Sequence, residues 1–490
     1  MIPIPAMPLG DVVAHAMPLL FLAVVAMLLL VASCFWRPAG GGAERGADVS
    51  VIGAVLGCLI AGGLAWVRFR GQEVPQTAML FAFDRIGWLG GLFLLAATIP
   101  TLLLAGPYLR ERRLPLPEFV ALVLFGVVGM WTMILTTHLV MIFLGLETLS
   151  LAAYVLAGYH RAARPSIEAG VKYFLLGAIA AGFLLFGLAF LYGGTGSFDL
   201  RTIAQTVFAE ITGFHRLYTL IGIALICVGL AFKIGAVPFQ FWTPDVYTGA
   251  PLPVTIFFAT AVKIGAFCVF WRVGEAVTPM LGGVWQQAMW GLAVATMLLG
   301  NLAALAQDDL KRMLAYSSIA HAGYALIALV IGHGASLFFY LAAYAIMTIG
   351  AFATLMALGS EGRERTTLAD VAGLGTTHPR HAFVLALFLF SLAGIPPTVG
   401  FFAKYYLFQA AIGGEQVTLV VIAVINSVVS VAYYVRPVVV MYFRPVPEQG
   451  VRPLALTGGM RFVIGLSLAG VVGLGLFPSR LLALIAQIWR

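Results

Sequence analysis

The sequence predicts an all-α protein that crosses a membrane many times. Of its 490 residues, 61% are hydrophobic and 10% are charged, whereas soluble domains contain about 25% charged residues. Apolar stretches recur along the whole chain, separated by glycine, proline or charged residues. A spanning helix needs about 20 mostly apolar residues. The pattern therefore predicts a polytopic helical bundle and excludes a soluble enzyme.

Glycine, proline and charge clusters serve as helix breaks, and between them we predict about fourteen spans. The first apolar run has no basic segment before it, which indicates a spanning helix rather than a cleaved signal peptide. The expected spans are 16–36, 51–68, 86–109, 115–136, 138–158, 170–192, 217–243, 252–274, 284–305, 311–332, 335–358, 381–411, 417–442 and 461–487.

The basic residues are distributed unevenly between the two sides of this bundle. Most of them, such as Arg110, Arg164 and Arg312, fall in loops after odd-numbered spans. Cytoplasmic loops carry the excess of Lys and Arg, so we expect these loops in the cytoplasm and both termini on the outer side. Topology thus accounts for the net charge of +8 without a nucleic-acid partner.

The longest polar stretch, residues 359–381, is expected to be a cytoplasmic connector. Its charges alternate in sign, which is typical of a loop that faces solvent or a partner: Glu361, Arg363, Glu364 and Arg365. Aromatic residues near span ends are expected to anchor them at the membrane surface: Trp242, Trp271 and Trp285.

Two spans, the seventh and the twelfth, carry proline in mid-membrane. Pro238 follows Lys233 in KIGAVPFQFWTP, and Pro396 and Pro397 precede Lys404 in AGIPPTVGFFAK. Proline removes a backbone N–H and frees a carbonyl, which lipid tolerates only where protein or water satisfies the freed group. Proline kinks are common in membrane helices, but a lysine near each kink favours a functional origin.

The two interrupted spans lie five spans apart, which indicates two five-helix units, spans 4–8 and 9–13. Such pairs of interrupted spans are typical of inverted-repeat transporters, and an odd number of helices per unit requires the second unit to be inverted. The chain is then divided into an N-terminal three-helix segment, a first repeat, a second repeat and a C-terminal helix: 1–110, 111–275, 276–445 and 446–490.

Four charged residues lie inside apolar stretches: Glu147, Lys233, Lys263 and Lys404. Each such charge costs about 2.5–3.5 kcal/mol on insertion scales, and the usual reason to retain one is an ion or proton path. Glu147 and Lys233 are expected to pair, since each lowers the cost of the other's charge. Pairing for assembly alone is the alternative, but three lysines against one glutamate argue against it.

His321, in LAYSSIAHAGYALIAL, is a candidate bridging group between the lysines, because histidine changes charge near neutral pH. It is equally consistent with a hydrogen bond that joins helices. The sequence contains no CxxC pair, Walker loop, GxGxxG fingerprint or haem motif. We therefore expect this chain to bind no metal, nucleotide or redox centre.

Three stretches carry a resemblance to a known family: VPFQFWTPDVYTGAPLPVTIFFATAVKIGAF, GNLAALAQDDLKRMLAYSSIAHAGY and SLAGIPPTVGFFAKYYLF. With FLGLETLSLAAYVLAGY they resemble the antiporter-like membrane subunits of bacterial NADH:quinone oxidoreductase (respiratory complex I). The stretch WTPDVYTGAP is similar to the subunit N branch. The resemblance covers about residues 115–440 and rests on length and span count elsewhere.

The resemblance implies fourteen spans, two inverted repeats and a row of proton-relaying residues: Glu147, Lys233, Lys263, His321 and Lys404. It implies that NADH, flavin, iron–sulfur clusters and quinone are bound by partner subunits, and that this chain is an enzyme only within the assembly. Its expected partners are the other membrane subunits, including neighbouring antiporter-like subunits, together with the lipid bilayer and protons. Its expected location is the bacterial inner membrane.

Three other functions stay open on sequence grounds. A subunit of a cation/proton antiporter complex and a membrane subunit of a ferredoxin- or hydrogenase-linked complex would share the lysines and broken helices. The stretch WTPDVYTGAP favours the oxidoreductase or a ferredoxin-fed relative. The last of the three is a scaffold whose charges only organise its neighbours, and charge-neutral substitution would separate it from the transport functions.

Overall fold

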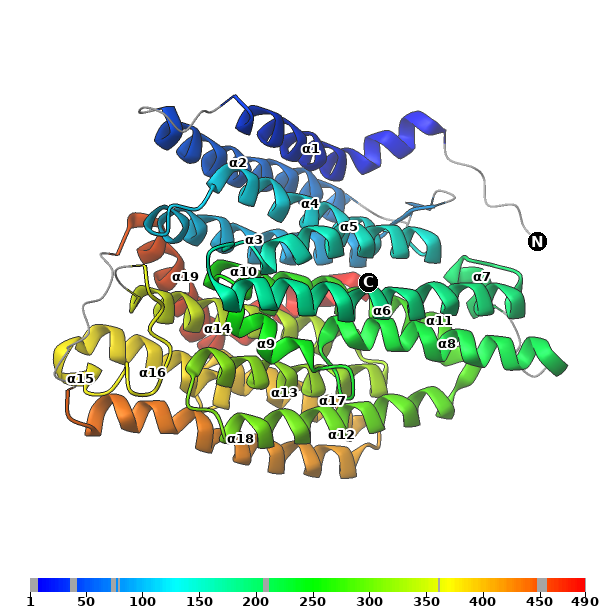
Figure 1. Ribbon diagram of the computed structural model, residues 1–490. Helices are drawn as coiled ribbons and strands as arrows, with labels where there is room; N and C mark the ends of the chain where they lie inside the picture. The colour runs from blue at the N-terminus through cyan, green and yellow to red at the C-terminus, as the bar shows by residue number, and fades with distance from the viewer. Residues whose placement is uncertain are drawn as a thin grey trace.

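The helices run side by side through one bundle, with α1 and α2 along one edge and α12 and α18 along the opposite edge (Figure 1). This computed structural model describes residues 8–35, 42–71, 76–77, 80–205, 211–359, 362–446 and 456–489. Glu361, expected in the connector, lies outside the described residues.

The elements follow one another in this order. Up to the first break the chain forms α1 (Leu9–Ser33), α2 (Gly42–Gly71), β1 (Gln76–Thr77), β2 (Ala82–Phe83), α3 (Arg85–Glu111), α4 (Leu116–Ile134), α5 (Leu139–Ala157), α6 (Arg164–Thr195), α7 (Leu200–Ala204) and α8 (Gly213–Ile234). It continues with α9 (Trp242–Gly249), α10 (Leu252–Phe257), the π-helical η1 (Phe258–Val262), α11 (Lys263–Leu281), α12 (Gly283–Leu305), α13 (Leu310–Ile331) and α14 (Gly334–Ala357). It ends with α15 (Leu374–Thr377), α16 (Pro379–Ala393), α17 (Val399–Gly413), α18 (Val417–Phe443), α19 (Gly458–Leu476), α20 (Pro478–Ile485) and the 3₁₀ turn η2 (Ala486–Trp489).

The predicted all-α membrane fold is confirmed. Thirteen helices of the described chain are long and apolar enough to cross a membrane. The expected span 381–411 is present as two shorter helices, α16 and α17, on either side of its prolines. The expected final span, 461–487, is too long. The helix α19 ends at Leu476, and a separate short helix, α20, begins at Pro478. Proline cannot donate the backbone bond that would continue the helix.

Both predicted breaks are present, and each begins at a left-handed glycine. α8 ends at Ile234 and is followed by Gly235, with φ of 72°; α16 ends at Ala393 and is followed by Gly394, with φ of 91°. Glycine takes this conformation without the steric cost of a side chain. The seventh span was expected to reach residue 243, but its helix, α8, ends at Ile234, and the chain re-forms a short separate helix, α9, after the break.

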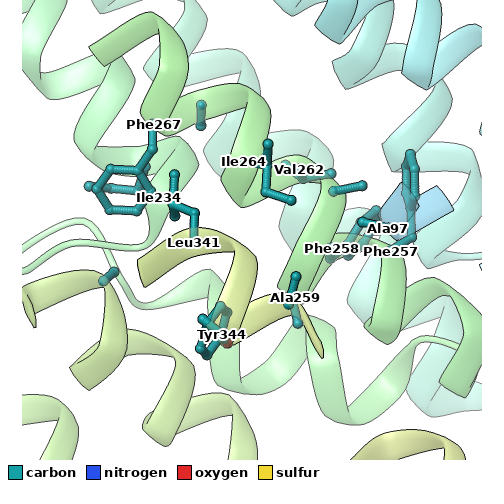
Figure 2. Close-up of a cluster of buried hydrophobic side chains, with 14 of the residues drawn as sticks. Ala97, Ile234, Phe257, Phe258, Ala259, Val262, Ile264, Phe267, Leu341 and Tyr344 are labelled. Atoms are coloured by element: carbon teal, nitrogen blue, oxygen red, sulfur yellow. The ribbon is translucent and has the colours of Figure 1, made fainter. Parts of the chain in front are cut away.

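The span α10–η1–α11 is the centre of the bundle, because its whole apolar window is buried inside the protein. Figure 2 shows Phe257, Phe258, Val262 and Ile264 from this span among side chains of α3, α8 and α14. The π-helical turn η1 directly precedes Lys263. No glycine or proline in this turn indicates it in the sequence. Such single-turn π-bulges are frequent at functional sites.

The tryptophan prediction was wrong. Trp242, Trp271 and Trp285 are only 2%, 5% and 3% exposed, so they fill the interior rather than mark the membrane surface. The cause for Trp242 is visible in its hydrogen bond, since its indole N–H donates to the Phe232 carbonyl at 2.8 Å. That carbonyl lies in the last turn of α8, where it also accepts from the backbone N–H of Gly235 at 3.1 Å.

Helix pairs recur in the two halves of the chain. In the first half α4 packs on α5 and α6 on α8, and in the second α12 packs on α13 and α14 on both α16 and α17. The contact of α4 with α5 is close because Gly129 faces Gly145. A Cβ atom at either glycine would lie 2.6 Å from the carbonyl oxygen of the other. Small residues allow membrane helices this approach.

We predict that Gly129→Ala separates α4 from α5 and lowers stability by about 1–3 kcal/mol, the usual cost of overpacking. Thermal unfolding of the detergent-solubilised protein measures the effect. Gly182→Ala on α6 is the matched control, because a Cβ there meets nothing within 4 Å. Equal melting temperatures for the two variants would contradict the packing argument.

Candidate functional site

Four of the five predicted site residues lie deep inside the bundle. Lys233, Lys263, His321 and Lys404 are only 4%, 2%, 3% and 5% exposed, and they come from α8, α11, α13 and α17. Glu147 on α5 is half-buried. Within the described chain no two of these five residues form a hydrogen bond or an ion pair with each other. Other polar groups therefore connect them.

Glu147 and Lys233 interact through space rather than by contact. The Lys233 ammonium donates to the hydroxyl of Ser150 at 2.9 Å, and Ser150 lies one turn beyond Glu147 on α5. The Lys233 Nζ also lies 5.4 Å from the centre of the Tyr173 ring and 5.8 Å from that of Tyr154, within range of a cation–π interaction. The ammonium of Lys233 is thus held by one hydroxyl and two aromatic rings. In the described structure it forms no hydrogen bond or ion pair with Glu147.

Lys263 connects the central span to α13. Its ammonium donates to the backbone carbonyl of Ser318, which is three residues before His321 on the same helix. The Lys263 Nζ lies 5.8 Å from the Tyr344 ring of α14. The hydroxyl groups of Tyr247 and Ser318 are both buried. A buried hydroxyl therefore lies on the residue whose carbonyl Lys263 contacts.

His321 uses both ring nitrogens. Its Nδ1 forms a 2.6 Å hydrogen bond with the Tyr340 hydroxyl, and its Nε2 forms a 3.2 Å bond with the Tyr434 hydroxyl. Tyr434 is also hydrogen-bonded to Ser317. The histidine joins α13 to α14 and α18, which agrees with a structural role. Its partners are hydroxyls that both donate and accept, so the same contacts suit a bridging role.

Lys404 satisfies the second helix break. Its ammonium donates to the Ala393 carbonyl at 2.8 Å and to the Ser427 hydroxyl at 2.9 Å. Ala393 is the last residue of α16, so its carbonyl is one that the break frees. The Lys404 Nζ lies 5.1 Å from the Tyr324 ring. A cavity of about 450 Å³ between α17 and α18 borders this lysine.

The tyrosines of this region were missed by the sequence analysis. Six buried tyrosines lie between or beside these residues: Tyr173, Tyr247, Tyr324, Tyr340, Tyr344 and Tyr434. Their sequence signal was a hydroxyl group in the middle of apolar runs. Spacing was a further signal in α14, where Tyr340 and Tyr344 are four residues apart and share one helix face.

At one end of the bundle Asp245 holds three helices together. Its carboxylate accepts from Lys172 of α6 at 2.7 Å and from Arg312 of α13 at 2.8 Å. Burial would raise the pKa of Asp245, but these two hydrogen bonds hold it below the usual range of an aspartate. The residue therefore fixes α9, the helix that follows the first break, as an anchor rather than as a proton carrier.

Comparisons with known proteins were made for the whole chain. A family profile described as NADH:quinone oxidoreductase/Mrp antiporter, TM matches residues 136–430. A protein of Trichlorobacter lovleyi called NADH-quinone oxidoreductase subunit N is 40% identical over 96% of each chain. One with the same name from Rhodospirillum rubrum is 41% identical over 94% of each chain.

Solved structures agree with the sequence relatives. A chain of respiratory complex I from Thermus thermophilus with bound aureothin is 33% identical, with a TM-score of 0.80 over 95% of this chain and 98% of that one. A chain of the Mrp complex from Dietzia sp. shares the fold at 22% identity, with a TM-score of 0.80 over 97% of each chain. This chain belongs to the NADH:quinone oxidoreductase/Mrp antiporter family, and its sequence relatives place it in the subunit N branch.

Proposed function

We propose that this chain is a proton-translocating membrane subunit of a bacterial NADH:quinone oxidoreductase. Glu147, Lys233, Lys263, His321 and Lys404 would form its relay. The subunit contributes to the enzyme only within the assembly, where its partners are the other membrane subunits. NADH, flavin, iron–sulfur clusters and quinone would be bound by those partners. The chain would lie in the inner membrane with both termini on the outer side, as the basic residues of its loops indicate.

One observation carries the relay assignment: among the described residues, no carboxylate contacts Lys233, Lys263 or Lys404. Their ammonium groups donate to hydroxyl and carbonyl oxygens instead. Buried cations elsewhere in the same protein are paired, since Arg272 contacts Asp84 at 2.6 Å and Lys311 contacts Glu364 at 2.7 Å. A buried charge without a counter-ion is costly. Residues kept in that state are suited to losing and regaining a proton.

The geometry suggests how a proton would move. While Glu147 is ionised, its charge stabilises the ammonium of Lys233. If the carboxylate is neutralised or displaced, Lys233 would release its proton towards Lys263, and the buried hydroxyls of Tyr247 and Ser318 would help to carry it. Hydroxyls can accept one proton and donate another, and water can bridge gaps that they leave.

The second half of the relay would run along α13. From Lys263 the proton would pass to His321 and its tyrosine partners, and from there past Tyr324 to Lys404. We also propose the division of the chain at 110, 275 and 445, which assigns Glu147, Lys233 and Lys263 to the first repeat and His321 and Lys404 to the second. A proton would then cross from one repeat to the other between Lys263 and His321.

We predict that Lys233→Ala abolishes NADH-driven proton pumping, because it removes the group whose charge Glu147 controls. Membrane vesicles that carry the variant are energised with NADH, and assembly of the complex is checked on a native gel. Arg363→Ala, on an exposed connector residue, is the control and should pump normally. Pumping by an assembled Lys233→Ala complex would mean that the buried charges serve architecture.

We predict that Lys263→Arg also stops pumping, although it keeps the positive charge. The guanidinium group of arginine is not deprotonated in proteins, so it cannot pass a proton on. The measurement is the number of protons pumped per NADH oxidised, at equal amounts of assembled complex. A normal ratio in this variant would show that position 263 needs a charge and not a transferable proton.

A further inference from the structure

Glu364 does not face solvent or a partner as the connector's charge pattern indicated. Its carboxylate enters the bundle, where one oxygen lies 2.7 Å from the Lys311 ammonium. The other oxygen accepts from the Tyr108 hydroxyl and from the backbone N–H of Leu252, the latter at 3.2 Å. Lys311 is only 1% exposed, and it also donates to the Ala250 carbonyl at 2.6 Å. We call this set of contacts the connector clasp.

The clasp joins the connector to three helices. Tyr108 belongs to α3, Lys311 lies in the first turn of α13, and Leu252 is the first residue of α10. A carboxylate at a helix N-terminus interacts favourably with the helix dipole and satisfies a backbone N–H that the helix leaves free. In the part of the chain that the structure describes, Glu364 is the only carboxylate that forms an ion pair with Lys311.

The clasp lies at one end of the span that carries Lys263. That span passes from α10 through η1 into α11, and Lys263 is the first residue of α11. On the other side of Lys263 the span is held by Arg272, which donates to both oxygens of Asp84 and to the Ile134 carbonyl. The central span is therefore fixed by a buried ion pair on each side of Lys263.

The two ion pairs differ in strength. Arg272 and Asp84 form two parallel hydrogen bonds, at 2.6 and 2.7 Å, a geometry that holds both partners in one orientation. Lys311 meets Glu364 through a single ammonium group that can rotate. The π-helical turn lies on the weaker side, between the clasp and Lys263. A shift of α10 would therefore be absorbed in this turn.

Lys263 and the clasp depend on the same pair of helices. The Lys263 ammonium donates to Ser318 of α13, and Lys311 lies two turns before Ser318 on that helix. We propose that Glu364 is a positioning residue for proton transfer at Lys263. It holds α10 against α13, which keeps Lys263 at the Ser318 carbonyl and beside His321. The proposal rests on the proposed function, in which Lys263 carries protons.

The test is Glu364→Gln in the assembled complex. Glutamine keeps an oxygen that can accept from Tyr108 and Leu252 but loses the attraction to Lys311. We expect most proton pumping per NADH oxidised to be lost at equal amounts of assembled complex, and Glu364→Asp to restore part of it. A purely structural role would lower the amount of complex and leave this ratio unchanged. Arg363→Ala, on the neighbouring connector residue, is the matched control.

The double variant Glu364→Gln/Lys311→Met separates positioning from the cost of an unpaired charge. It removes both charges, so no buried ammonium lacks a partner, but the tie between α10 and α13 is still broken. We expect the double variant to pump as poorly as Glu364→Gln. A normal ratio in the double variant would overturn the proposal, and it decides the question even if Glu364→Gln fails to assemble.

Lys263→Arg is measured in parallel. If it stops pumping while Glu364→Gln keeps a normal ratio, the positioning role of the clasp is wrong and the relay stands. If Lys263→Arg itself pumps normally, the relay assignment is wrong.

Discussion

Within a bilayer each polar group needs a partner that the protein supplies, and this constraint explains much of the structure. Water is absent from the hydrocarbon region, so a carbonyl freed by a helix break must be satisfied internally. At the first break the indole of Trp242 donates to the Phe232 carbonyl, and the Thr296 hydroxyl accepts from the Val237 N–H. At the second break the donor is Lys404 itself. One break is therefore closed by neutral groups and the other by a proton-carrying candidate.

The same constraint separates the buried cations into two kinds. Arg272 and Lys311 each contact a carboxylate and fix helices to one another. Lys233, Lys263 and Lys404 contact neutral oxygens and aromatic faces. Breaking a buried ion pair leaves an uncompensated charge, so the first kind is expensive to change. The second kind has no such pair to break, and its protonation can change without loss of a helix contact.

Much of this could be predicted from sequence because the signals were local. The length of the apolar stretches predicted the spans, and the prolines predicted the breaks. Charged residues inside apolar stretches identified Glu147 and the three lysines as candidates. What was missed depended on tertiary contacts. Trp242 has the sequence position of a membrane anchor, but it is buried and donates to the Phe232 carbonyl in the last turn of α8. Glu364 belongs to a loop of alternating charges, yet among the described residues it is the only carboxylate that pairs with the buried Lys311.

The π-helical turn before Lys263 had no sequence signal, because phenylalanine, alanine, threonine and valine suit an ordinary helix equally well. The buried tyrosines were also missed, since tyrosine is common in apolar helices and only its neighbours reveal whether the hydroxyl matters. Around His321 those neighbours come from α14 and α18, which are adjacent to α13 only in the folded bundle. Spacing within one helix cannot indicate such a cluster.

In the proposed relay, Glu147 and Lys233 are joined by no hydrogen bond or ion pair among those described, which has a mechanical consequence. Ser150 takes the hydrogen bond of the lysine, so the carboxylate acts through Coulomb attraction alone, which varies with distance and local dielectric. A small displacement of α5 would therefore change the stability of the ammonium without breaking a bond. Leu144 and Leu151, on the same face of α5 as Glu147, are 51% and 61% exposed. Two apolar side chains on the face of α5 that carries Glu147 are thus left uncovered by this chain.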